Sequence, residues 1–404
     1  MKIYVILVKF SFNYFLMIFM IINADLHVHS KYSMATSKNM DPETMALESV
    51  KKGLDLVATG DAFHSGWLNE LEDSLVEIDN TGIYKTNDTI ETNNTKFITT
   101  TEVEDNQRIH HLIIIPSIEV AWNMRDEFTV KNMDADGRPR IRMNGAEIMD
   151  IARDYNCIIG PAHIFTPWTG LYKSYDSVTD CYGQQPDFVE LGLSSDSDLA
   201  DTIKELADYT FLTNSDSHSP WPHRIGREFN RMELKDLSFK SLCFSIKNND
   251  IIENYGFDPR MGKYHETGCI DCHRIYNIHD AVECDMKCSC GGRIKKGVKG
   301  RIQELASFDK PHHPSHRPHY QYLLPLAELL STVHDKGVTT KYVQTRYDRL
   351  LDLFGNEIDV LLNTPIEKIA TVDMLLANVI KSYRDNTLDV IPGRGGQYGE
   401  VNYN

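Results

Sequence analysis

The sequence predicts an α/β barrel, followed by a short cysteine-rich module and a mainly helical C-terminal region. Up to residue 256, short apolar runs typical of buried strands alternate with segments of helical periodicity. Histidines and carboxylates repeatedly follow the apolar runs, and strand ends are where α/β barrels place their chemistry. Beyond this part the cysteines cluster, and from residue 301 the apolar pattern is helical.

The expected elements of the barrel follow one another in a regular order. Asp41 and Pro42 predict the start of a helix that Gly53 ends, because Asp caps helices, Pro suits the first turn and Gly suits the end. Residues 79–96 are polar and rich in Asn and Thr, which predicts a surface loop. We expect strands at 20–24, 54–59, 96–101, 109–115, 157–163, 188–191 and 210–214, and helices at 41–52, 68–78, 145–155 and 199–209.

The expected domain boundaries follow changes in composition. The barrel is assigned to residues 20–256 and a zinc-binding module to 257–300, which are rich in Gly, Cys, Lys and Arg and poor in periodic apolar residues. Residues 301–404 are expected to form a helical domain with a Gly-rich tail. Its helices are predicted at 323–332, 340–354, 358–362 and 366–383, and a loop is predicted at 391–399.

The N-terminal 22 residues are almost wholly apolar, with Lys2 and Lys9 as the charged exceptions. This length is close to the ~20 residues that span a bilayer, so a membrane anchor and a signal peptide are two interpretations. We expect a third, in which residues 1–19 come from an upstream start codon and lie outside the fold. A membrane helix ending at Met20 would leave no linker before the first barrel strand, and no convincing small-residue cleavage site precedes Asp25. No membrane partner is therefore expected.

The composition limits the classes of function. With 404 residues, 41% of them hydrophobic, the chain can bury the cores of two or three domains. The formal net charge of -16 argues against a protein that binds nucleic acid over its whole surface, but it is compatible with a local basic face. Most of the eight cysteines lie in one short segment, which favours metal binding over disulfides and therefore a reducing, cytoplasmic compartment.

The run Asp25-Leu26-His27-Val28-His29-Ser30 stands at the end of the first expected strand. Residues i and i+2 of a strand point to the same side, so His27 and His29 would aim two imidazoles at one point. Similar side chains stand at or near the ends of later strands: Asp61, His64, Glu102, His110, His163, Asp216 and His218. A single histidine is more often an ordinary core or surface residue, but this repetition predicts a multinuclear metal site.

Cysteines form a second group of candidate metal ligands. Cys269 and Cys272 make a CxxC pair, and Cys288 and Cys290 make a CxC pair that two glycines follow. Two such cysteine pairs predict a tetrahedral structural zinc site, with Cys284 as a substitute ligand. Four thiolates would leave no open position on the metal, so the predicted role is structural. Chance clustering of free thiols is the alternative.

Two segments are candidates for contact with a phosphate backbone. Around the second cysteine pair stand Lys287, Arg293, Lys295, Lys296, Lys299 and Arg301. On an otherwise acidic protein this basic strip indicates nucleic-acid binding, and a solvated face is the alternative. The second segment is Gly393-Arg394-Gly395-Gly396-Gln397-Tyr398-Gly399, whose glycines would let amides approach phosphate while Tyr398 stacks on a base. A flexible tail is the alternative there.

The order of the histidine and carboxylate motifs resembles the polymerase-and-histidinol-phosphatase (PHP) family of metal-dependent phosphoesterases. The resemblance implies a distorted seven-stranded (β/α) barrel with a site for up to three metals. Residue by residue, it implies the ligands His27, His29, Asp61, His64, Glu102, His110, His163, Asp216 and His218. Glu102 would be the bridging carboxylate, and Asp216, Glu102 and His218 are the implied catalytic residues.

This sequence departs from the PHP pattern in two places. The usual adjacent Asp-His pair is spaced as Asp61-Ala62-Phe63-His64, which leaves open whether Asp61, His64 or both bind. His111 could replace His110, although strand alternation puts the two on opposite faces. Glu119 and Glu190 are reserve ligands near strand ends. Two or three divalent metals (Zn, Mn, Mg or Fe) would suit these donors, and would activate water for phosphodiester hydrolysis.

A narrower resemblance, to the endonuclease Q family, covers residues 20 to about 400. Its specific runs here are residues 24–33, 215–224, 290–298 and 322–328. These mainly archaeal DNA-repair enzymes join a PHP barrel to a cysteine zinc module and a helical domain, which implies that residues 301–404 are a helical DNA-binding domain. The resemblance implies cleavage 5′ of a deaminated base (uracil, hypoxanthine or xanthine) or an abasic site, with the base flipped into a pocket. Some relatives bind the sliding clamp through a C-terminal peptide, but residues 400–404 contain no such motif.

Two other functions remain open from the sequence. A small-molecule phosphatase of the histidinol-phosphate type would share the barrel, but it has no need of a zinc module, a basic strip or a helical domain. A non-enzymatic nucleic-acid binder with a decayed metal site would explain the basic strip. The apparently complete ligand set argues against decay. Activity on a duplex with one uracil, compared with a phosphomonoester, distinguishes the three.

Overall fold

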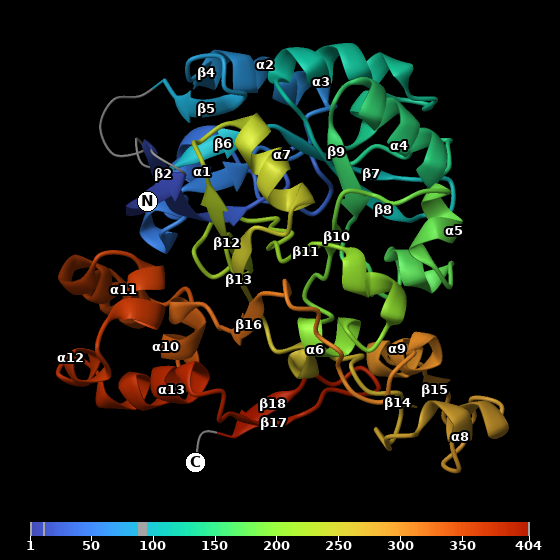
Figure 1. Cartoon of the computed structure of the whole chain (residues 1–404). Helices are drawn as coiled ribbons and strands as arrows, with labels where there is room; N and C mark the ends of the chain where they lie inside the picture. The colour runs from blue at the N-terminus through green and yellow to red at the C-terminus, as the bar shows by residue number, and fades with distance from the viewer. Residues whose placement is uncertain (1, 11–12, 88–94, 403–404) are drawn as a thin grey trace.

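The computed structural model describes residues 2–10, 13–87 and 95–402, and for the residues before 19 it describes the backbone alone. The barrel begins with three parallel strands, β2 (Asn13–Asp25), β3 (Leu56–Ala58) and β6 (Lys96–Ile98). The apolar residues at the end of β2 are fully buried, which is what parallel strands covered on both faces require. Figure 1 shows the strands of the barrel enclosed by helices.

Three antiparallel strands continue the wall: β7 (Thr100–Glu104), β8 (His110–Ile114) and β9 (Ile158–Pro161). Next comes a short parallel pair, β10 (Val189–Glu190) with β11 (Phe211–Leu212). The ring closes where β12 (Phe229–Leu234) pairs antiparallel with β2, and β13 (Ile251–Gly256) pairs with β12. This mixture of parallel and antiparallel pairs is the distorted barrel that the PHP resemblance implies, so the predicted fold class is confirmed.

In the described part of the chain, seven α-helices and a small hairpin accompany the barrel strands. The helices are α1 (Pro42–Lys52), α2 (Ser65–Ser74), α3 (Ile118–Met124), α4 (Gly145–Asp154), α5 (Val178–Tyr182), α6 (Ser197–Ala200) and α7 (Phe239–Lys247). The Asp41 side chain accepts the Thr44 amide and Gly53 adopts a left-handed φ of 97°, so α1 begins and ends as predicted. The hairpin consists of β4 (Leu75–Glu77) and β5 (Ile83–Thr86).

Three predictions about the barrel elements are wrong. The helix expected at 68–78 ends earlier, because α2 covers Ser65–Ser74 and the strand β4 covers Leu75–Glu77. The expected loop at 79–96 contains β5, in which Ile83 and Tyr84 are buried; residues 88–94 lie outside the described residues. The expected helix at 199–209 is replaced by α6 and a 3₁₀ turn at Lys204–Asp208. The reason is tertiary, because Asp201 turns away to accept the Arg317 guanidinium, at 2.9 to 3.2 Å, and the His312 amide.

The N-terminal strand β1 (Lys2–Phe10) is antiparallel to β2, in the register Lys2↔Ile21 to Phe10↔Asn13. Among the described residues, β2 pairs with β1 from Asn13 to Ile21, with β12 from Met20 to Ala24, and with β3 at Ala24 and Asp25. The assignment of residues 1–19 to an extension outside the fold stays a prediction. Within the described residues, no helix is both long and apolar enough to cross a membrane.

The C-terminal region contains α10 (Leu326–His334), α11 (Lys341–Phe354), α12 (Ile366–Ala370) and α13 (Met374–Arg384), with a π turn at Asp359–Asn363. The single helix expected at 366–383 is thus divided, because Asp373 caps a new helix by accepting the Leu376 amide. The strand β16 (His319–Tyr322) adds to β13 and connects this region to the barrel sheet. The expected loop at 391–399 lies between β17 (Asp389–Ile391) and β18 (Glu400–Asn402).

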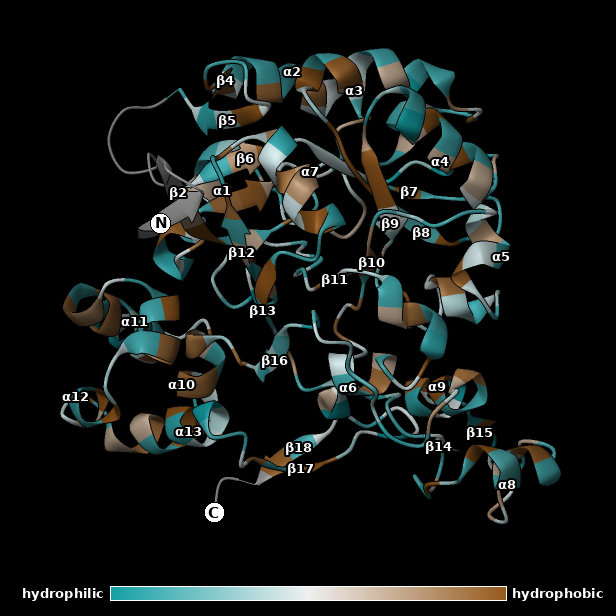
Figure 2. Cartoon of the chain, viewed as in Figure 1, coloured by the Kyte–Doolittle hydropathy of each residue, from teal (hydrophilic) through white to brown (hydrophobic). Residues whose placement is uncertain are grey.

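The helical region and the barrel share one apolar core, which includes residues from α10, α11 and α13 together with residues of α1, α2 and β3. A buried ion pair crosses this contact, with Lys52 Nζ 2.6 Å from Glu357 Oε1. Glu357 also accepts the Tyr347 hydroxyl and the Leu326 amide, so the charge is fully hydrogen-bonded. The strand β9, brown in Figure 2, illustrates the apolar interior of the barrel.

The cysteine module comprises β14 (Gly268–Cys269), β15 (Ile294–Lys295), α8 (Ile278–Glu283) and α9 (Val298–Leu305). Its own core is a separate small cluster of Cys269, Ala281, Cys288 and Ile294. In Figure 1 the module and the helical region lie on the same side of the barrel, with the β17–β18 hairpin between them.

Candidate metal centre

His27 and His29 follow β2, and an isolated parallel bridge between Val28 and Ser217 brings them beside the Ser215–His218 motif. The His29 amide donates to the Ser217 carbonyl over 2.9 Å. This contact places ligand atoms of His27, His29 and Asp216 within 4.8 Å of one another. Strand alternation accounts for both imidazoles pointing to one site, as expected.

A second group lies on the antiparallel sheet. Glu102 stands on β7, His110 on β8 and His163 directly after β9, and their ligand atoms also lie within 4.8 Å of one another. In the register, Glu104 faces His110 and Glu102 faces Leu112, so Glu102 and His110 are diagonal neighbours on one face. Glu102 Oε1 lies 2.8 Å from His110 Nδ1 and 3.0 Å from His163 Nε2.

Glu102 joins the two groups into one cluster. Its Oε1 lies 3.7 Å from His27 Nε2, and its Oε2 lies 3.4 Å from His29 Nε2. The carboxylate is fully buried and faces histidines from both groups. This is the position that a bridging carboxylate would occupy between two metal ions, although the ligand roles themselves stay predictions.

The donor atoms fit divalent metal ions. His27 Nε2 is buried, and among the described residues it has no hydrogen-bond partner. The other ring nitrogen, Nδ1, lies 3.1 Å from both oxygens of Glu190, so the carboxylate fixes the ring and leaves Nε2 facing the cluster. A carboxylate behind the histidine is typical of metal ligands. Imidazole and carboxylate together suit Zn, Mn or Fe.

Asp61 holds His29 in the same way. Asp61 Oδ1 lies 2.9 Å from His29 Nδ1, and Asp61 Oδ2 accepts the amide and hydroxyl of Ser30, each over 2.6 Å. The structure therefore places Asp61 behind a histidine and in neither group of clustered ligand atoms. His64 is further away, at the start of α2, with its ring 4.3 Å from that of Tyr32.

The remaining expected and reserve residues lie at different distances from the cluster. His218 is at its rim, with Nδ1 3.8 Å from Asp216 Oδ1 and about a third of the side chain exposed, at 32%. His111 points to the opposite face of β8 and contacts Tyr182, as the alternation predicts. Glu190 lies behind His27, whereas Glu119 is exposed on α3.

Three residues of the site have left-handed backbone conformations that are rare outside glycine. Their φ angles are 50° for Asp61, 30° for His163 and 47° for Asp216. Gly60 precedes Asp61 with a φ of 66°, and a Cβ there would lie 2.2 Å from the Val28 carbonyl oxygen. Such strain concentrates at functional sites, where the surrounding structure holds the side chains in place.

Sequence reasoning missed Arg138. Its Nη1 donates to Glu102 Oε2 over 3.2 Å, and 27% of its side chain is exposed. The preceding Gly137 lets its loop approach the cluster, because a Cβ there would lie 2.4 Å from Asp61 Oδ2. The arginine stands in an irregular loop with no strand end or motif beside it, so the sequence carries no signal for its position.

The charges of the cluster change the proton affinities of its members. Burial disfavours the charged form of His27, but Glu190 and Glu102 outweigh burial and raise the pKa of His27 to about 9. Burial also disfavours a charged Glu102, yet His110 and His27 hold the pKa of this carboxyl well below its usual range. The site is thus built to attract positive charge.

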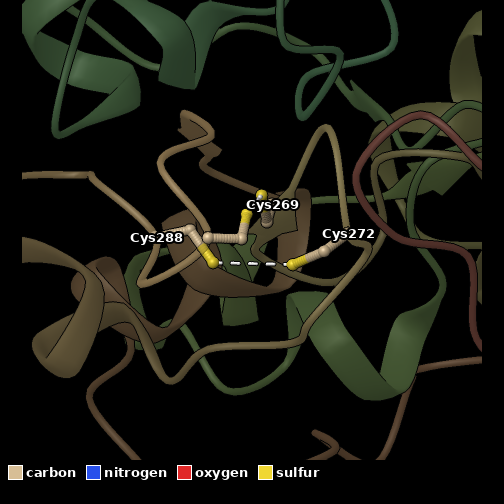
Figure 3. Close-up of side chains that lie close together, drawn as sticks. Cys269, Cys272 and Cys288 are labelled. Atoms are coloured by element: carbon tan, nitrogen blue, oxygen red, sulfur yellow. Dashed lines mark hydrogen bonds between the residues drawn. The ribbon is translucent and has the colours of Figure 1, made fainter.

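The four predicted zinc ligands of the cysteine module converge. Their sulfur atoms lie within 4.8 Å of one another, and Figure 3 shows the side chains of Cys269, Cys272 and Cys288 together. Cys269 Sγ is 3.6 Å from Cys290 Sγ, and Cys272 Sγ is 3.5 Å from Cys288 Sγ. Cys284 is not in the group and its thiol contacts the Ala281 carbonyl. The donor set fits one zinc ion.

The predicted DNA-binding residues have varied surroundings. Lys296 pairs with Glu304, Lys299 with Glu266, and Arg301 with Asp176 and Glu304. Arg394 donates to the His273 and Pro392 carbonyls. Lys295 lies 3.9 Å above the Trp168 ring, whereas Arg293 and Tyr398 are exposed. Their role in DNA binding stays a prediction.

The Gly-rich segment packs against the cysteine module. A Cβ at Gly395 would lie 2.1 Å from the Cys269 carbonyl oxygen, and a Cβ at Gly393 would lie 2.3 Å from that of Gly262. The Glu266 amide donates to the Gly393 carbonyl, and the Gly396 amide donates to the Lys263 carbonyl. These close contacts require glycine at positions 393 and 395, independently of any approach to a phosphate.

Known proteins resemble both the whole chain and its parts. The family model of the MJ0043 C-terminal domain matches residues 325–387. The protein MJ0043 of Methanocaldococcus jannaschii is 47% identical over 256 residues, which are 62% of this chain and 32% of that protein. This chain therefore spans about a third of the length of MJ0043. The protein YqxK of Bacillus subtilis is 31% identical over 406 residues, covering 94% of this chain and 99% of YqxK.

Two solved structures match over nearly the full length. One is the lesion-specific endonuclease Q of Pyrococcus furiosus, with a TM-score of 0.90, 46% identity and 95% of each chain covered. The other is endonuclease Q in complex with a 27-mer duplex substrate that has an abasic lesion at the active site. Its TM-score is 0.87, with 46% identity, 95% of this chain and 96% of the other covered. The chain belongs to the endonuclease Q family.

Proposed function

We propose that this protein is a metal-dependent DNA repair endonuclease that cuts the strand on the 5′ side of a deaminated base or an abasic site. The observation that carries the proposal is the cluster around Glu102, together with the close likeness to a lesion-specific endonuclease and to a complex with an abasic duplex. The proposed lesions are uracil, hypoxanthine, xanthine and the abasic site.

In this proposal His27, His29 and Asp216 hold metal on one side of Glu102, and His110 and His163 hold metal on the other. The bound metal would supply hydroxide at neutral pH and neutralise charge on the phosphoryl oxygens. Glu190 holds the His27 ring through its Nδ1 atom, and Asp61 holds the His29 ring in the same way. Asp61 and His64 are proposed here as supports of the site, and not as primary ligands.

Arg138 and His218 are proposed to contact the scissile phosphate. Both side chains are partly exposed beside the cluster, with 27% exposed for Arg138 and 32% for His218. The Arg138 guanidinium presents several donors in one plane, which suits phosphate oxygens. Burial and the neighbouring His29 lower the pKa of His218, so this imidazole is neutral at pH 7 and can accept a proton there.

DNA would extend from the barrel toward the cysteine module and the helical region. A hollow of about 640 Å³ lies between the barrel and the module, and Lys173, Arg293, Lys295, Lys296 and Arg301 are among its lining residues. Phosphate contacts of this kind position the duplex without reading its sequence. Tyr398, in the Gly-rich segment that packs against the module, is exposed, and Lys263 Nζ lies 5.7 Å from its ring.

The test is cleavage of a labelled duplex with one uracil or one abasic site, after chelation and addition of a single divalent metal. We expect one nick 5′ of the lesion, no nick in the undamaged duplex, and no reaction before metal is added. Glu102→Gln should eliminate the nick. Glu119→Gln is the matched control, because Glu119 is exposed on α3, and it should cleave as wild type does. Hydrolysis of a phosphomonoester without any nick would instead support the phosphatase.

A further inference from the structure

A second cluster of metal-type side chains lies on the face of β8 that points away from the metal centre. Asp105 follows β7, His111 stands on β8 and Cys181 stands on α5. Their exposed fractions are 3%, 0% and 3%. One ligand atom from each residue lies within 4.8 Å of the other two.

Among the described residues, two ligand atoms of this cluster have no hydrogen-bond partner. Asp105 Oδ1 accepts the amides of Gln107 and Ile109, each over 2.8 Å. Asp105 Oδ2 and His111 Nε2 lie 3.4 Å apart, and neither has a hydrogen-bond partner among the described residues. Buried polar atoms are rarely left in this state. Two such atoms that face each other and a thiol indicate that a cation belongs between them.

The surroundings fix the imidazole and leave room beside it. His111 Nδ1 lies 2.7 Å from the Tyr182 hydroxyl oxygen, so the ring is oriented with Nε2 toward Asp105. Gly145 begins α4 next to the thiol, and a Cβ at this position would lie 2.7 Å from Cys181 Sγ and 3.1 Å from His111 Cε1. A side chain there would close the space between the three ligands.

We propose that Asp105, His111 and Cys181 form a buried structural site for a zinc-like divalent ion, separate from the metal centre and from the cysteine module. Thiolate, imidazole and carboxylate are the three ligand types of protein zinc sites. On binding, the Cys181 thiol would release its proton to solvent, and Nδ1–H of His111 would donate to Tyr182. The ion would offset the two negative charges that a carboxylate and a thiolate bring to one buried place.

The role of such an ion would be to hold β8 in place. Asp105 shapes the turn between β7 and β8 through its two amide contacts, and Cys181 belongs to α5 on the outside of the barrel. An ion between them would tie this turn to the helix. His110, a member of the metal centre, is the residue before His111, so the ion would also steady one ligand of the centre. This inference does not rest on the proposed function.

The first test is the metal content of the purified full chain. Cys181→Ala and His111→Gln should each lose one zinc per chain compared with wild type. Cys157→Ala is the matched control, because Cys157 is also a buried thiol with an exposed fraction of 3%, and its sulfur contacts Met124. It should retain the full count. An unchanged zinc count in both Cys181→Ala and His111→Gln would overturn the proposal.

The second test uses the unaltered protein, so it does not depend on whether a variant folds. Anomalous scattering at the zinc edge from a crystal of the zinc-saturated chain should show a peak between Asp105, His111 and Cys181. The peak expected in the cysteine module serves as the internal reference for occupancy. A strong peak at the four cysteines with none at Asp105 would show that the second cluster is a hydrogen-bonded core element, and would overturn the proposal.

Discussion

The metal centre of the barrel and the cysteine module hold their ligands in different ways. In the barrel, the ligands come from several strand ends, and carboxylates such as Glu190 and Asp61 fix the histidines from behind. This arrangement rests on an apolar core shared with the helical region. The module has a core of only Cys269, Ala281, Cys288 and Ile294 among the described residues. We therefore expect the fold of the module to depend on a bound metal more strongly than the fold of the barrel does.

The basic strip shows a related contrast. The histidine and carboxylate motifs of the barrel converge on one place, but Lys296, Lys299 and Arg301 of the strip pair with acidic neighbours. Each of these ion pairs is partly exposed and contributes little to stability. A cluster of lysines in the sequence thus predicts a positively charged surface. The structure shows which of these charges are already paired with acidic side chains.

The largest effect is expected from Asp216→Ala. This change removes a member of the metal centre but leaves the basic strip intact, so cleavage should fall to the background of the assay while DNA affinity largely survives. Binding and cleavage of the same lesion duplex measure the two effects separately. Turnover close to wild type in this variant would remove Asp216 from the site.

A smaller loss should follow from Glu190→Gln. The amide can still contact His27 Nδ1 but carries no charge, so the imidazole becomes a weaker metal ligand. Removing such a supporting carboxylate typically costs about 10- to 100-fold in metal affinity or activity. Titration of the chelated enzyme with metal, followed by cleavage, gives the shift. If the metal requirement is unchanged, Glu190 supports the backbone only, through the His163 amide.

Metal loading should depend on pH, since protons and metal compete for His27. The pKa of this imidazole in the metal-free site is raised to about 9, so the ring is protonated at neutral pH until a metal displaces the proton. The metal concentration for half-maximal loading should therefore decrease as the pH rises from about 6 to about 9. Isothermal titration in buffers of different ionisation enthalpy would count the released protons. Loading without proton release would contradict the pKa direction.

The smallest effect concerns the strip. Changing Lys295 and Lys296 together to Ala should weaken binding of damaged and undamaged duplexes alike, because phosphate contacts carry no base information. The slope of log affinity against log salt should shrink by roughly one for each phosphate that the variant no longer neutralises. Lys296 already pairs with Glu304, so most of the change should come from Lys295. An unchanged slope would leave the strip as a solvated face.

The parts of the site that the sequence predicts are those encoded in short runs. The two histidines of the Asp25-to-Ser30 run lie together because of strand alternation alone, and the four cysteines converge because their spacing is local. Glu190 is predicted only as a reserve ligand, since its position behind His27 depends on the packing of β10. Arg138 escapes prediction, because a loop far from the motifs in sequence brings it to Glu102.

The elements of the fold also differ in whether local sequence signals or contacts between distant residues determine them. The early strands and α1 are predictable because caps and apolar runs are local signals. The helix expected at 199–209 fails because Asp201 binds Arg317, a contact between distant residues. The strands β12, β13 and β16 are absent from the sequence prediction. The first two carry buried polar side chains such as Asn230 and Asn254, which bind each other and the Thr213 region in the interior, so their apolar pattern is interrupted.

We propose a division of roles in which the barrel performs the chemistry and the cysteine module contributes binding. Its most direct test is the single-turnover cleavage rate of a lesion duplex, measured with Asp216→Ala and with Cys272→Ser at saturating enzyme. Cys272→Ser should loosen the module and weaken affinity, yet it should retain the barrel metals and cleave at close to the wild-type rate, while Asp216→Ala should not cleave. If Cys272→Ser abolished cleavage at saturating enzyme while Asp216→Ala still cleaved, the proposed division of roles would be wrong.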